Sequence, residues 1–387
     1  MSSLAIYFYA GDFVDAWGNY VRGLPQAYAS HDQLMAMVER LADGGTDVSV
    51  VSFITEAPRR EVVRPGVEIV HLGADDYSTR RLLRRSVREA SSDLVVAHFP
   101  NEELLRAAVR SNARVLAVLA TSYNERSLRA RIRRLPLLRL LNDERVEFVA
   151  NHCEPSTQQL RELGVHADKL IPWNVGISTD PSQFPPRELA DASERGLFYA
   201  GAVTRDKGVP DLIEAVGVLR DRGHRVRLRV AGGGETDLMQ RIITDRGLES
   251  EVDLIGPISN ERVVSEMRSA DLVVVPSRHV FPEGLPFTLF EALAARTPVV
   301  CSDHPVFEYF VDGCSASTFR ERDVDGLADA IERPLTDGEL YHRLSVAATA
   351  TWERLGRTVD LPTLIERWVA DDPGSPWLRK RTLAALG

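Results

Sequence analysis

Two glutamates in the second half of the chain are the residues whose type and spacing point most directly to chemistry. Glu283 and Glu291 have seven residues between them and follow the apolar run Leu272–Val275. The turn Gly284-Leu285-Pro286 predicts a helix beginning near Pro286, because proline is favoured at the first helical position. Glu283 then precedes the helix and Glu291 lies more than one turn inside it, so they are not placed to share one proton. Each carboxylate could accept hydrogen bonds from a different polyol, one from a sugar and one from a ribose.

A second candidate is the glycine-containing turn Gly201–Gly208, which directly follows the apolar run Leu197–Ala200 and precedes an expected helix. The backbone N–H groups of such a turn and the positive end of a helix bind anions. Arg205 and Lys207 add two full positive charges, and Lys207 is one of only three lysines among the 47 basic residues. The GK[ST] spacing of a P-loop is absent. The turn is interpreted as a diphosphate site, with a connection that carries surface charges as the alternative.

Two further segments are placed to approach the same anion. The N–H groups of Leu285, Phe287 and Thr288 would point at a diphosphate, whereas Pro286 has no N–H group to offer. Gly232-Gly233-Gly234 follows another apolar run, and glycines let a backbone come close to a ligand. A flexible connecting loop is the alternative explanation for these three glycines.

Short apolar runs alternate with longer amphipathic stretches along the whole chain, which is the pattern of βα units in parallel sheets. Expected helices include Asp32–Ala42 and Glu102–Arg110. The expected strands of the first half are Leu4–Tyr9, Asp47–Ile54, Val67–Leu72, Leu94–Phe99, Val115–Leu119 and Val146–Ala150. Those of the second half are Leu197–Ala200, Val226–Ala231, Val252–Ile255, Leu272–Val275 and Val299–Cys301.

These elements predict an α/β protein of two Rossmann-like, doubly wound parallel-sheet domains facing a cleft. A length of 387 residues fits two domains. The proline-containing stretch Ser178–Gly196 has no clear period and is interpreted as a linker. The predicted domains are residues 1–180 for the acceptor and 181–355 for the donor, and a tail, 356–387, is expected to pack across their interface. Ligands of such sheets bind at the carboxyl ends of the strands, so the motifs are expected there.

The second half of the chain resembles the donor domain of retaining glycosyltransferases with the GT-B fold, in particular glycosyltransferase family 4. That family has a glycine-rich turn ending in Lys-Gly and two glutamates with seven residues between them. Here its elements appear in the same order as Lys207-Gly208, Pro276-Ser277, Glu283-Gly284, Glu291-Ala292 and Pro298-Val299-Val300. The resemblance is good from Gly196 to about Pro334 and is limited to the general pattern in the first half.

The resemblance implies transfer of a sugar from a nucleotide-diphosphate sugar to an acceptor, with retention of anomeric configuration. It implies no metal or other cofactor, and the sequence places no Asp-x-Asp pair beside these motifs. Lys207 and Arg205 would hold the diphosphate, and Glu283 and His98 would contact the transferred sugar, although a lone histidine at a strand end is also commonly structural. The ribose would contact Glu291 and the base would lie against Gly256-Pro257-Ile258. The implied donor-binding residues are Gly201, Gly233, Pro257, Ile258, Gly284, Leu285, Phe287, Thr288 and Glu291.

In the first half, the loop Gly11–Ser30 occupies the place of the family's substrate loop. Trp17, Gly18, Asn19 and Tyr20 are therefore its candidate acceptor-binding residues, although the loop lacks the family's usual Gly-Gly pair. Two more departures lie near the donor motifs: Ala202 stands where the family usually has arginine, and Arg296 where it has glycine. They keep open a non-catalytic nucleotide-sugar-binding subunit. A sugar-nucleotide epimerase, also built from two Rossmann-like domains, is the other alternative.

Charge is distributed unevenly along the chain. The net charge of −9 argues against nucleic-acid binding, yet residues 80–145 hold fifteen arginines against seven acidic residues. Two expected helices carry most of them, with Arg80, Arg81, Arg84, Arg85 and Arg88 on one and Arg126, Arg129, Arg131, Arg133, Arg134 and Arg139 on the other. These arginines form either a solvated face or a docking surface for anionic lipid or an anionic acceptor.

Composition and patterning limit the remaining possibilities. No apolar run is long enough to span a bilayer and no signal-peptide pattern opens the chain, so a cytoplasmic protein is expected. The three cysteines have no metal-ligand spacing. The acceptor is expected to be either a small soluble molecule or a membrane-bound glycan precursor. The nucleotide, the sugar and the oligomeric state are left open.

Overall fold

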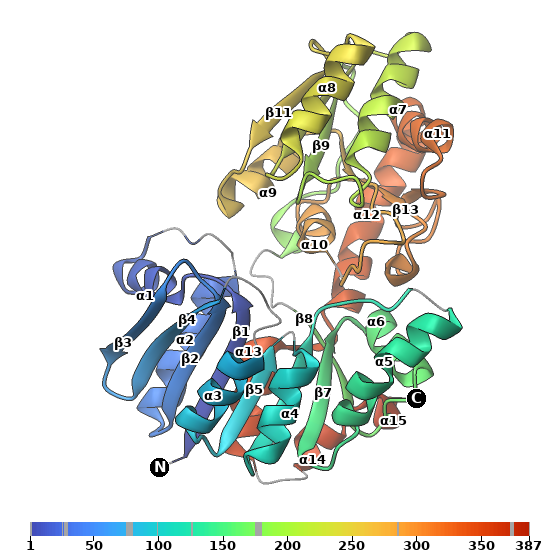
Figure 1. Ribbon diagram of the computed structural model, residues 1–387. Coiled ribbons are helices and arrows are strands. Elements are labelled where there is room, and N and C mark those ends of the chain that lie inside the picture. Colours follow the sequence, from blue (N-terminus) through green and yellow to red (C-terminus); the bar gives the residue numbers. More distant parts are fainter. Residues whose placement is uncertain are drawn as a thin grey trace. The chain divides into compact units, whose positions relative to one another are not determined.

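The computed structural model describes residues 2–24, 26, 30–74, 80–98, 100–124, 127–174, 180–284, 286–371 and 375–386. Its contacts divide the chain into two compact units. Unit 1 comprises Met1–Gly176 and Thr358–Gly387, and unit 2 comprises Ile177–Arg357. Each unit is built on one largely parallel sheet covered by helices (Figure 1). The predicted fold class of two doubly wound α/β domains is thereby confirmed.

Unit 1 contains a nine-stranded sheet in the order β15-β8-β7-β6-β5-β1-β2-β4-β3. Neighbouring strands are parallel except for the antiparallel pair β3 and β4 at one edge. The strands are β1 (Ser3–Ala10), β2 (Asp47–Ile54), β3 (Pro58–Arg64), β4 (Val67–Ala74), β5 (Leu94–His98), β6 (Arg114–Leu119), β7 (Val146–His152), β8 (Leu170–Asn174) and β15 (Val359–Asp360). Of these, β3, β8 and β15 were not predicted from the sequence.

The helices of unit 1 connect these strands. They are α1 (Phe13–Arg22), α2 (Ser30–Asp43), α3 (Arg80–Ala90), α4 (Glu102–Arg110), α5 (Leu128–Leu141), α6 (Glu154–Glu162), α13 (Leu361–Ala370), α14 (Pro376–Arg379) and α15 (Leu383–Leu386). Buried side chains of α3, α4, α5 and α6 join one hydrophobic cluster with alternate residues of the sheet. Parallel strands require helical crossovers of this kind, which is why the strands of the sheet interior are apolar on both faces.

The predicted loop Gly11–Ser30 is wrong over Phe13–Arg22, which form α1. Asp12 caps the helix by accepting a hydrogen bond from Asp15 N at 2.9 Å, and Gly23 ends it in the left-handed conformation at φ 64°. Phe13, Ala16 and Trp17 are buried at the i, i+3 and i+4 spacing of one helix face. This apolar face, packed on its own unit, stabilises a helix despite a glycine and an asparagine in the middle.

Unit 2 contains a six-stranded sheet in the order β11-β10-β9-β12-β13-β14, and every neighbouring pair is parallel. The strands are β9 (Arg195–Ala200), β10 (Val226–Ala231), β11 (Val252–Gly256), β12 (Leu272–Val275), β13 (Val299–Ser302) and β14 (Ser317–Phe319). The helices are η1 (Pro181–Gln183), α7 (Val209–Asp221), α8 (Thr236–Arg246), α9 (Asn260–Ser269), α10 (Phe287–Ala294), η2 (Pro305–Phe307), α11 (Val324–Thr336) and α12 (Gly338–Leu355).

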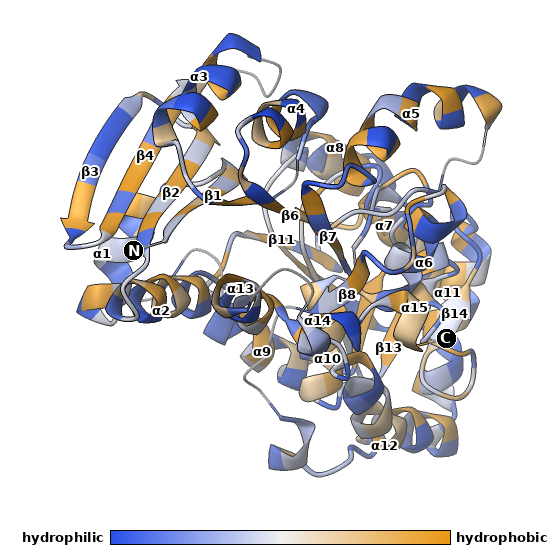
Figure 2. Ribbon diagram, turned by 90° about the horizontal axis from the view of Figure 1, so that it is seen from below, coloured by the Kyte–Doolittle hydropathy of each residue, from blue (hydrophilic) through white to orange (hydrophobic). Residues whose placement is uncertain are grey.

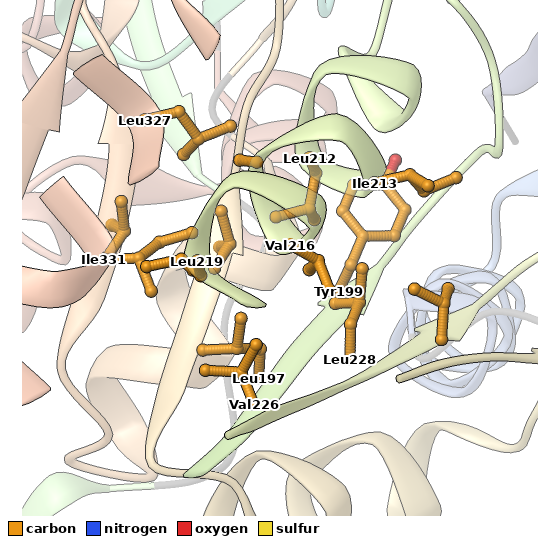
Figure 3. Close-up of a cluster of buried hydrophobic side chains, with 14 of the residues drawn as sticks. Leu197, Tyr199, Leu212, Ile213, Val216, Leu219, Val226, Leu228, Leu327 and Ile331 are labelled. Carbon is orange, nitrogen blue, oxygen red and sulfur yellow. The ribbon is translucent and has the colours of Figure 1, made fainter. Parts of the chain in front are cut away.

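The core of unit 2 lies between its sheet and α7. Leu212, Val216 and Leu219 project from α7 toward Leu197 and Leu228 of the sheet, and side chains of α11 close the cluster (Figure 3). All five named residues are almost fully removed from solvent. Burying a leucine or valine side chain contributes about 1.5–3 kcal/mol, so this layer fixes α7 and the turn that precedes it.

Residues 358–387 form part of unit 1. Val359 and Asp360 pair with β8, and Trp368 of α13 is completely buried. The boundaries between the units lie close to the predicted positions 180 and 355. The tail, however, is a structural component of unit 1 rather than a third segment. Its expected packing across a domain interface stays a prediction.

Each sheet has one point at which the strand order reverses. In unit 2 this point lies between β9 and β12, and in unit 1 it lies between β1 and β5. Ligands of open α/β sheets bind in the crevice beyond the carboxyl ends of the strands at such points. The loops that follow β9 and β12 are therefore the first place to look for a site in unit 2. Among the described residues, no helix has both the length and the apolar composition needed to cross a membrane.

Candidate functional site

The loops after β9 and β12 are joined through their backbones. Gly208 adopts φ 72°, and a Cβ atom at this position would lie only 1.9 Å from Pro276 O. Arg278 N donates a hydrogen bond to Asp206 O at 2.9 Å. The Arg278 guanidinium also forms two hydrogen bonds to the Asp211 carboxylate, at 2.6 and 2.9 Å. Only glycine permits this close approach, which explains on steric grounds why a glycine follows Lys207 in the sequence motif.

Lys207 and Glu283 meet across these two loops. Lys207 Nζ lies 2.5 Å from Glu283 Oε1, and the Ser277 hydroxyl donates to the same oxygen at 2.5 Å. The ammonium also lies 4.3 Å from the ring centre of Phe281. Only 4% of Glu283 is exposed. The structure therefore brings together two of the predicted residues. It adds Ser277, which the motif contained, and Phe281, and neither was predicted as a site residue.

Arg205 lies in the same turn but outside this pair. Its backbone N donates to Glu235 Oε2 at 2.7 Å, and its side chain is exposed. Ala202, the neighbouring departure from the family pattern, is also exposed, and its carbonyl accepts a hydrogen bond from the Tyr199 hydroxyl at 2.7 Å. The turn thus offers one half-buried cation, Lys207, and one solvent-facing cation, Arg205.

The three consecutive glycines after β10 have different roles. A Cβ atom on Gly232 would lie 1.8 Å from Gly201 O, and one on Gly234 would lie 2.5 Å from Val203 O. These two positions therefore require glycine for packing between loops rather than for contact with a ligand. On Gly233, by contrast, a Cβ atom would make an ordinary contact of 3.7 Å with Pro257. Gly233 is exposed beside Pro257, and its position has no steric need for glycine within the protein.

Glu291 lies inside α10, as predicted. It is 7% exposed, and this burial raises the pKa of its carboxyl group to about 7, an effect that a hydrogen bond with Asn260 partly offsets. Thr288 in the first turn donates its hydroxyl hydrogen to Ala200 O at 2.8 Å, which ties the start of α10 to the end of β9. The first backbone N–H groups of a helix have no partner within the helix and can bind an anion.

The other predicted donor-binding residues surround this edge. Gly284 and Ile258 are partly buried, and Pro257 and Phe287 are exposed. Leu285 lies outside the described residues. The donor-binding roles of these residues stay predictions.

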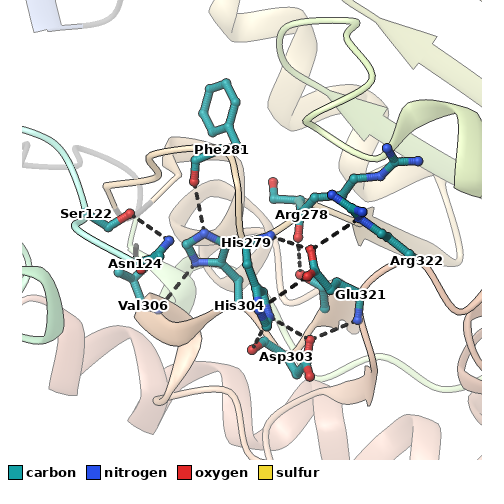
Figure 4. Close-up of polar contacts among 12 residues, drawn as sticks. Ser122, Asn124, Arg278, His279, Phe281, Asp303, His304, Val306, Glu321 and Arg322 are labelled. Atoms are coloured by element: carbon teal, nitrogen blue, oxygen red, sulfur yellow. Dashed lines mark hydrogen bonds and ion pairs between the residues drawn. The ribbon is translucent and has the colours of Figure 1, made fainter. Parts of the chain in front are cut away.

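A polar cluster behind the Glu283 loop was not predicted from the sequence (Figure 4). His279 Nε2 lies 2.9 Å from Asp303 Oδ1, and His279 N donates to Glu321 Oε2 at 2.6 Å. His304 Nε2 donates to Phe281 O at 3.1 Å, and burial lowers the pKa of His304 to about 4. The cluster holds the backbone that carries Phe281 and Glu283. Among the described residues, no group of three or more histidine, cysteine or acidic side chains is placed to hold a metal ion.

In unit 1, His98 ends β5 at the reversal point of the sheet. Its ring centre lies 5.1 Å from that of Phe8 and 6.4 Å from that of Trp173. Burial lowers the pKa of His98 to about 4, so the imidazole is neutral at pH 7. His152 at the end of β7 stacks on Trp173 at 4.7 Å and was not predicted. A neutral imidazole can both donate and accept a hydrogen bond, which suits contact with hydroxyl groups.

The predicted acceptor-binding residues occupy α1. Trp17 is buried, and the Tyr20 hydroxyl donates to Glu39 Oε2 at 2.7 Å. Gly18 O and Asn19 Oδ1 both accept hydrogen bonds from the Arg22 guanidinium, at 2.8 and 3.2 Å. These contacts give all four residues a structural role within unit 1, and their role in acceptor binding stays a prediction.

Comparison with known proteins shows which family unit 2 resembles. The family model of the glycosyl transferases group 1 matches residues 182–351, which lie within unit 2. The chain is 34% identical to the alpha-D-kanosaminyltransferase of Streptomyces kanamyceticus over 152 residues, which are 38% of each chain. It is 25% identical to the phosphatidyl-myo-inositol mannosyltransferase of Mycolicibacterium smegmatis over 338 residues, which are 83% of this chain and 84% of that one.

A solved structure resembles the fold over nearly its whole length. HepE of Anabaena in complex with UDP-glucose has a TM-score of 0.67 and 17% sequence identity, covering 96% of this chain and 98% of that one. The matches to the first curated relatives cover only 38% to 48% of their length. Unit 2 therefore resembles the glycosyl transferases group 1 over most of its length, and the chain has the GT-B fold. The predicted resemblance is confirmed.

Proposed function

We propose that this protein transfers a sugar from a nucleotide-diphosphate sugar to an acceptor. One observation carries the proposal: the contact between the half-buried Lys207 and the buried Glu283, at the reversal point of the unit 2 sheet and beside the start of α10. The family match of unit 2 supports a glycosyltransferase. The UDP-glucose bound to HepE, whose fold is similar, supports a nucleotide sugar as the donor.

The geometry suggests how the donor binds. A diphosphate that enters beside Lys207 competes with Glu283 for the ammonium, and Arg205 and the first N–H groups of α10 add positive charge. Glu283, freed from part of its ion pair, can then accept hydrogen bonds from hydroxyl groups of the sugar. Breaking a buried ion pair is costly unless each partner gains a replacement, and this exchange supplies both replacements.

The same groups would stabilise the departing diphosphate. Positive charge placed in advance where negative charge develops is commonly the largest contribution to a transfer reaction. We accordingly propose that Lys207, Arg205 and the helix N-terminus act without a bound metal. Retention of anomeric configuration is proposed from the family resemblance alone. The proposed acceptor is a small molecule or a glycan precursor, and the expected cytoplasmic location stays a prediction.

The non-catalytic alternative loses part of its basis in the structure. Arg296 follows the carboxyl end of α10, whereas Glu283 precedes the amino end of that helix. The presence of Arg296 in place of the family's glycine therefore affects the carboxyl end of α10. Ala202 remains as a departure, because the turn lacks the positive charge that the family's arginine would supply at this position. An epimerase would convert the nucleotide sugar without any acceptor, so turnover in the absence of an acceptor separates that alternative from transfer.

The first experiment is thermal unfolding with UDP, GDP, dTDP and ADP and their sugar conjugates. A ligand at 100 times its Kd adds about 2.7 kcal/mol to the unit that binds it, which raises Tm by several degrees. We expect one nucleotide family to shift the wild type and Lys380→Ala, in which an exposed lysine of unit 1 is removed. Lys207→Ala should show a much smaller shift and a kcat about a hundredfold lower. A wild type that responds to no nucleotide, or a Lys207→Ala variant within threefold of wild-type kcat, would contradict the proposal.

A further inference from the structure

Helix α5 exposes large apolar side chains on its outer face. Leu128, Ile132 and Leu135 are 73%, 58% and 42% exposed. Their i, i+4 and i+7 spacing places them along one side of the helix. The opposite side is buried, with Ala130 and Leu141 fully removed from solvent. Because α5 already has a buried face in the unit 1 core, the outer apolar stripe has no role in holding this unit together.

Exposed arginines flank this stripe. Arg129, Arg131, Arg133 and Arg139 are exposed, and α5 contains no acidic residue. Within the described parts of the chain, no carboxylate lies within ion-pair distance of Arg129, Arg131 or Arg139. Figure 2 shows hydrophobic and hydrophilic residues alternating along the helix. The outer face of α5 is therefore cationic and apolar at the same time.

The second arginine-rich helix, α3, is built differently. Of its large apolar residues, Leu83 and Val87 are buried and Leu82 is half-buried, so none is fully exposed. Arg84 lies 2.7 Å from Glu103, and Arg85 lies 2.6 Å from Glu89. Part of its charge is thus neutralised within unit 1, and its outer face carries no apolar stripe. Of the two arginine-rich helices that the sequence singled out, only α5 combines exposed apolar side chains with exposed arginines (Arg129, Arg131 and Arg139) for which the described residues show no ion pair.

We propose that α5 docks onto an anionic lipid membrane, in the plane of the interface. Leu128, Ile132 and Leu135 would enter the boundary between head groups and acyl chains, and the arginines would contact lipid phosphates. Arginine suits this position, because its long aliphatic stem can lie along an apolar surface while its charged end reaches the head groups. The net charge of −9 for the whole chain means that this attraction is local to the helix rather than general.

The positive charge of α5 favours a membrane over a second copy of this chain as its binding partner. A symmetric dimer through α5 would place the arginines of one copy against those of the other, since the same patch meets itself. Like charges facing each other oppose association. An anionic bilayer satisfies both the apolar stripe and the arginines. The inference does not depend on the proposed transfer reaction, although it favours an acceptor that resides at a membrane.

The test is co-sedimentation of the full chain with lipid vesicles at low salt. One set consists of phosphatidylcholine, and the other of phosphatidylcholine with phosphatidylglycerol. We expect the wild type to sediment only with the anionic set. The variant Leu128→Ser/Ile132→Ser/Leu135→Ser removes the apolar stripe and should lower the partition coefficient more than tenfold. Arg129→Gln/Arg131→Gln removes two charges and should lower it about thirtyfold, since each arginine near an anionic surface contributes roughly 1 kcal/mol.

Matched control variants separate α5 from general attraction. Arg81→Gln/Arg88→Gln removes the same charge from exposed positions of α3, and Val62→Ser removes an apolar side chain that is 69% exposed on β3. Both should bind within threefold of the wild type, and all variants should keep the wild-type Tm. The proposal is overturned if the α3 pair loses as much binding as the α5 pair. It is also overturned if the wild type sediments equally with neutral and anionic vesicles. A dimer that light scattering detects in the wild type but not in the serine variant would overturn it as well.

Discussion

At the scale of single residues, burial of Glu291 shifts the pKa of its carboxyl group, and the shift should be measurable as a pH dependence of stability. Burial raises the pKa of its carboxyl group from 4.5 to about 7 in the folded protein. Below pH 4.5 the group is protonated in both the folded and the unfolded state, and above about pH 7 it is ionised in both. Between these values the folded state holds more protons, so the free energy of unfolding falls as the pH rises.

Glu291→Gln removes this dependence while it keeps a polar side chain beside Asn260. We expect the wild type to lose stability relative to the variant between pH 4.5 and 7. The full difference is about 3 kcal/mol, because each pKa unit corresponds to about 1.4 kcal/mol. Urea unfolding of both proteins at pH 4.5, 6 and 8 measures it. A difference in stability that stays constant across the three pH values would mean that Glu291 titrates normally in the folded protein.

At the scale of elements, the end of α10 explains an unusual residue. Arg296 adopts φ 54°, in the left-handed region, immediately after the helix. Arg296 N donates to Leu293 O at 3.0 Å, and Thr297 N donates to Ala292 O at 3.1 Å. This is the hydrogen-bond pattern of a Schellman cap, a position that glycine normally fills. The family's glycine at this position therefore has a reason that lies in helix geometry.

Replacement of Arg296 should separate this strain from its side-chain contact. Arg296 Nη1 donates to Phe184 O at 2.9 Å, and both Arg296→Ala and Arg296→Gly lose that bond. Only glycine also relieves the left-handed conformation, which costs other residues about 1–2 kcal/mol. We therefore expect the glycine variant to be about 1 kcal/mol more stable than the alanine variant by urea unfolding. Equal stabilities would mean that the backbone is not strained, and a changed nucleotide Kd would connect this position to the donor site.

The elements also show what the sequence could reveal. Strands β2, β10 and β12 were predicted with their observed bounds, because they are apolar runs between clear turn signals. Strand β3 is an edge strand with three consecutive charged residues, Arg59, Arg60 and Glu61, and no buried position, so its pattern did not resemble a buried strand. The glutamate motif identified Glu283 and Lys207 because it is specific and local. The partners of His279 come from loops after β13 and β14, and no periodicity along the chain could have connected them.

At the scale of the whole molecule, unit 1 is assembled from two distant stretches of chain. Trp368 Nε1 donates to Glu147 Oε2 at 2.7 Å, and the Arg114 guanidinium lies 5.4 Å from the ring centre of Trp368. Arg40 and Glu366 form an ion pair at 2.7 Å. The returning stretch therefore covers apolar surface and completes the edge of the sheet at β8. Unit 2, by contrast, is a single continuous stretch, Ile177–Arg357.

This arrangement predicts which parts of the chain fold alone. Residues 177–357 should unfold cooperatively on their own, since their core is internal to one stretch. Residues 1–176 alone should aggregate or melt at a much lower temperature, because the pocket of Trp368 would be open and β8 would become an unprotected edge. Asn174 Nδ2 lies 3.0 Å from Thr358 Oγ1, so the two stretches of unit 1 end side by side.

A short glycine-serine linker in place of unit 2 should therefore restore the folding of unit 1. Size-exclusion chromatography and thermal unfolding would compare residues 1–176 with the linked chain of 1–176 and 358–387. Linked Trp368→Ala is a demanding control, since loss of a buried aromatic side chain costs about 3–5 kcal/mol. It should lie between the linked and the truncated chain in Tm. If residues 1–176 alone match the linked chain, the returning stretch contributes no stability, and its burial must be ascribed to function instead.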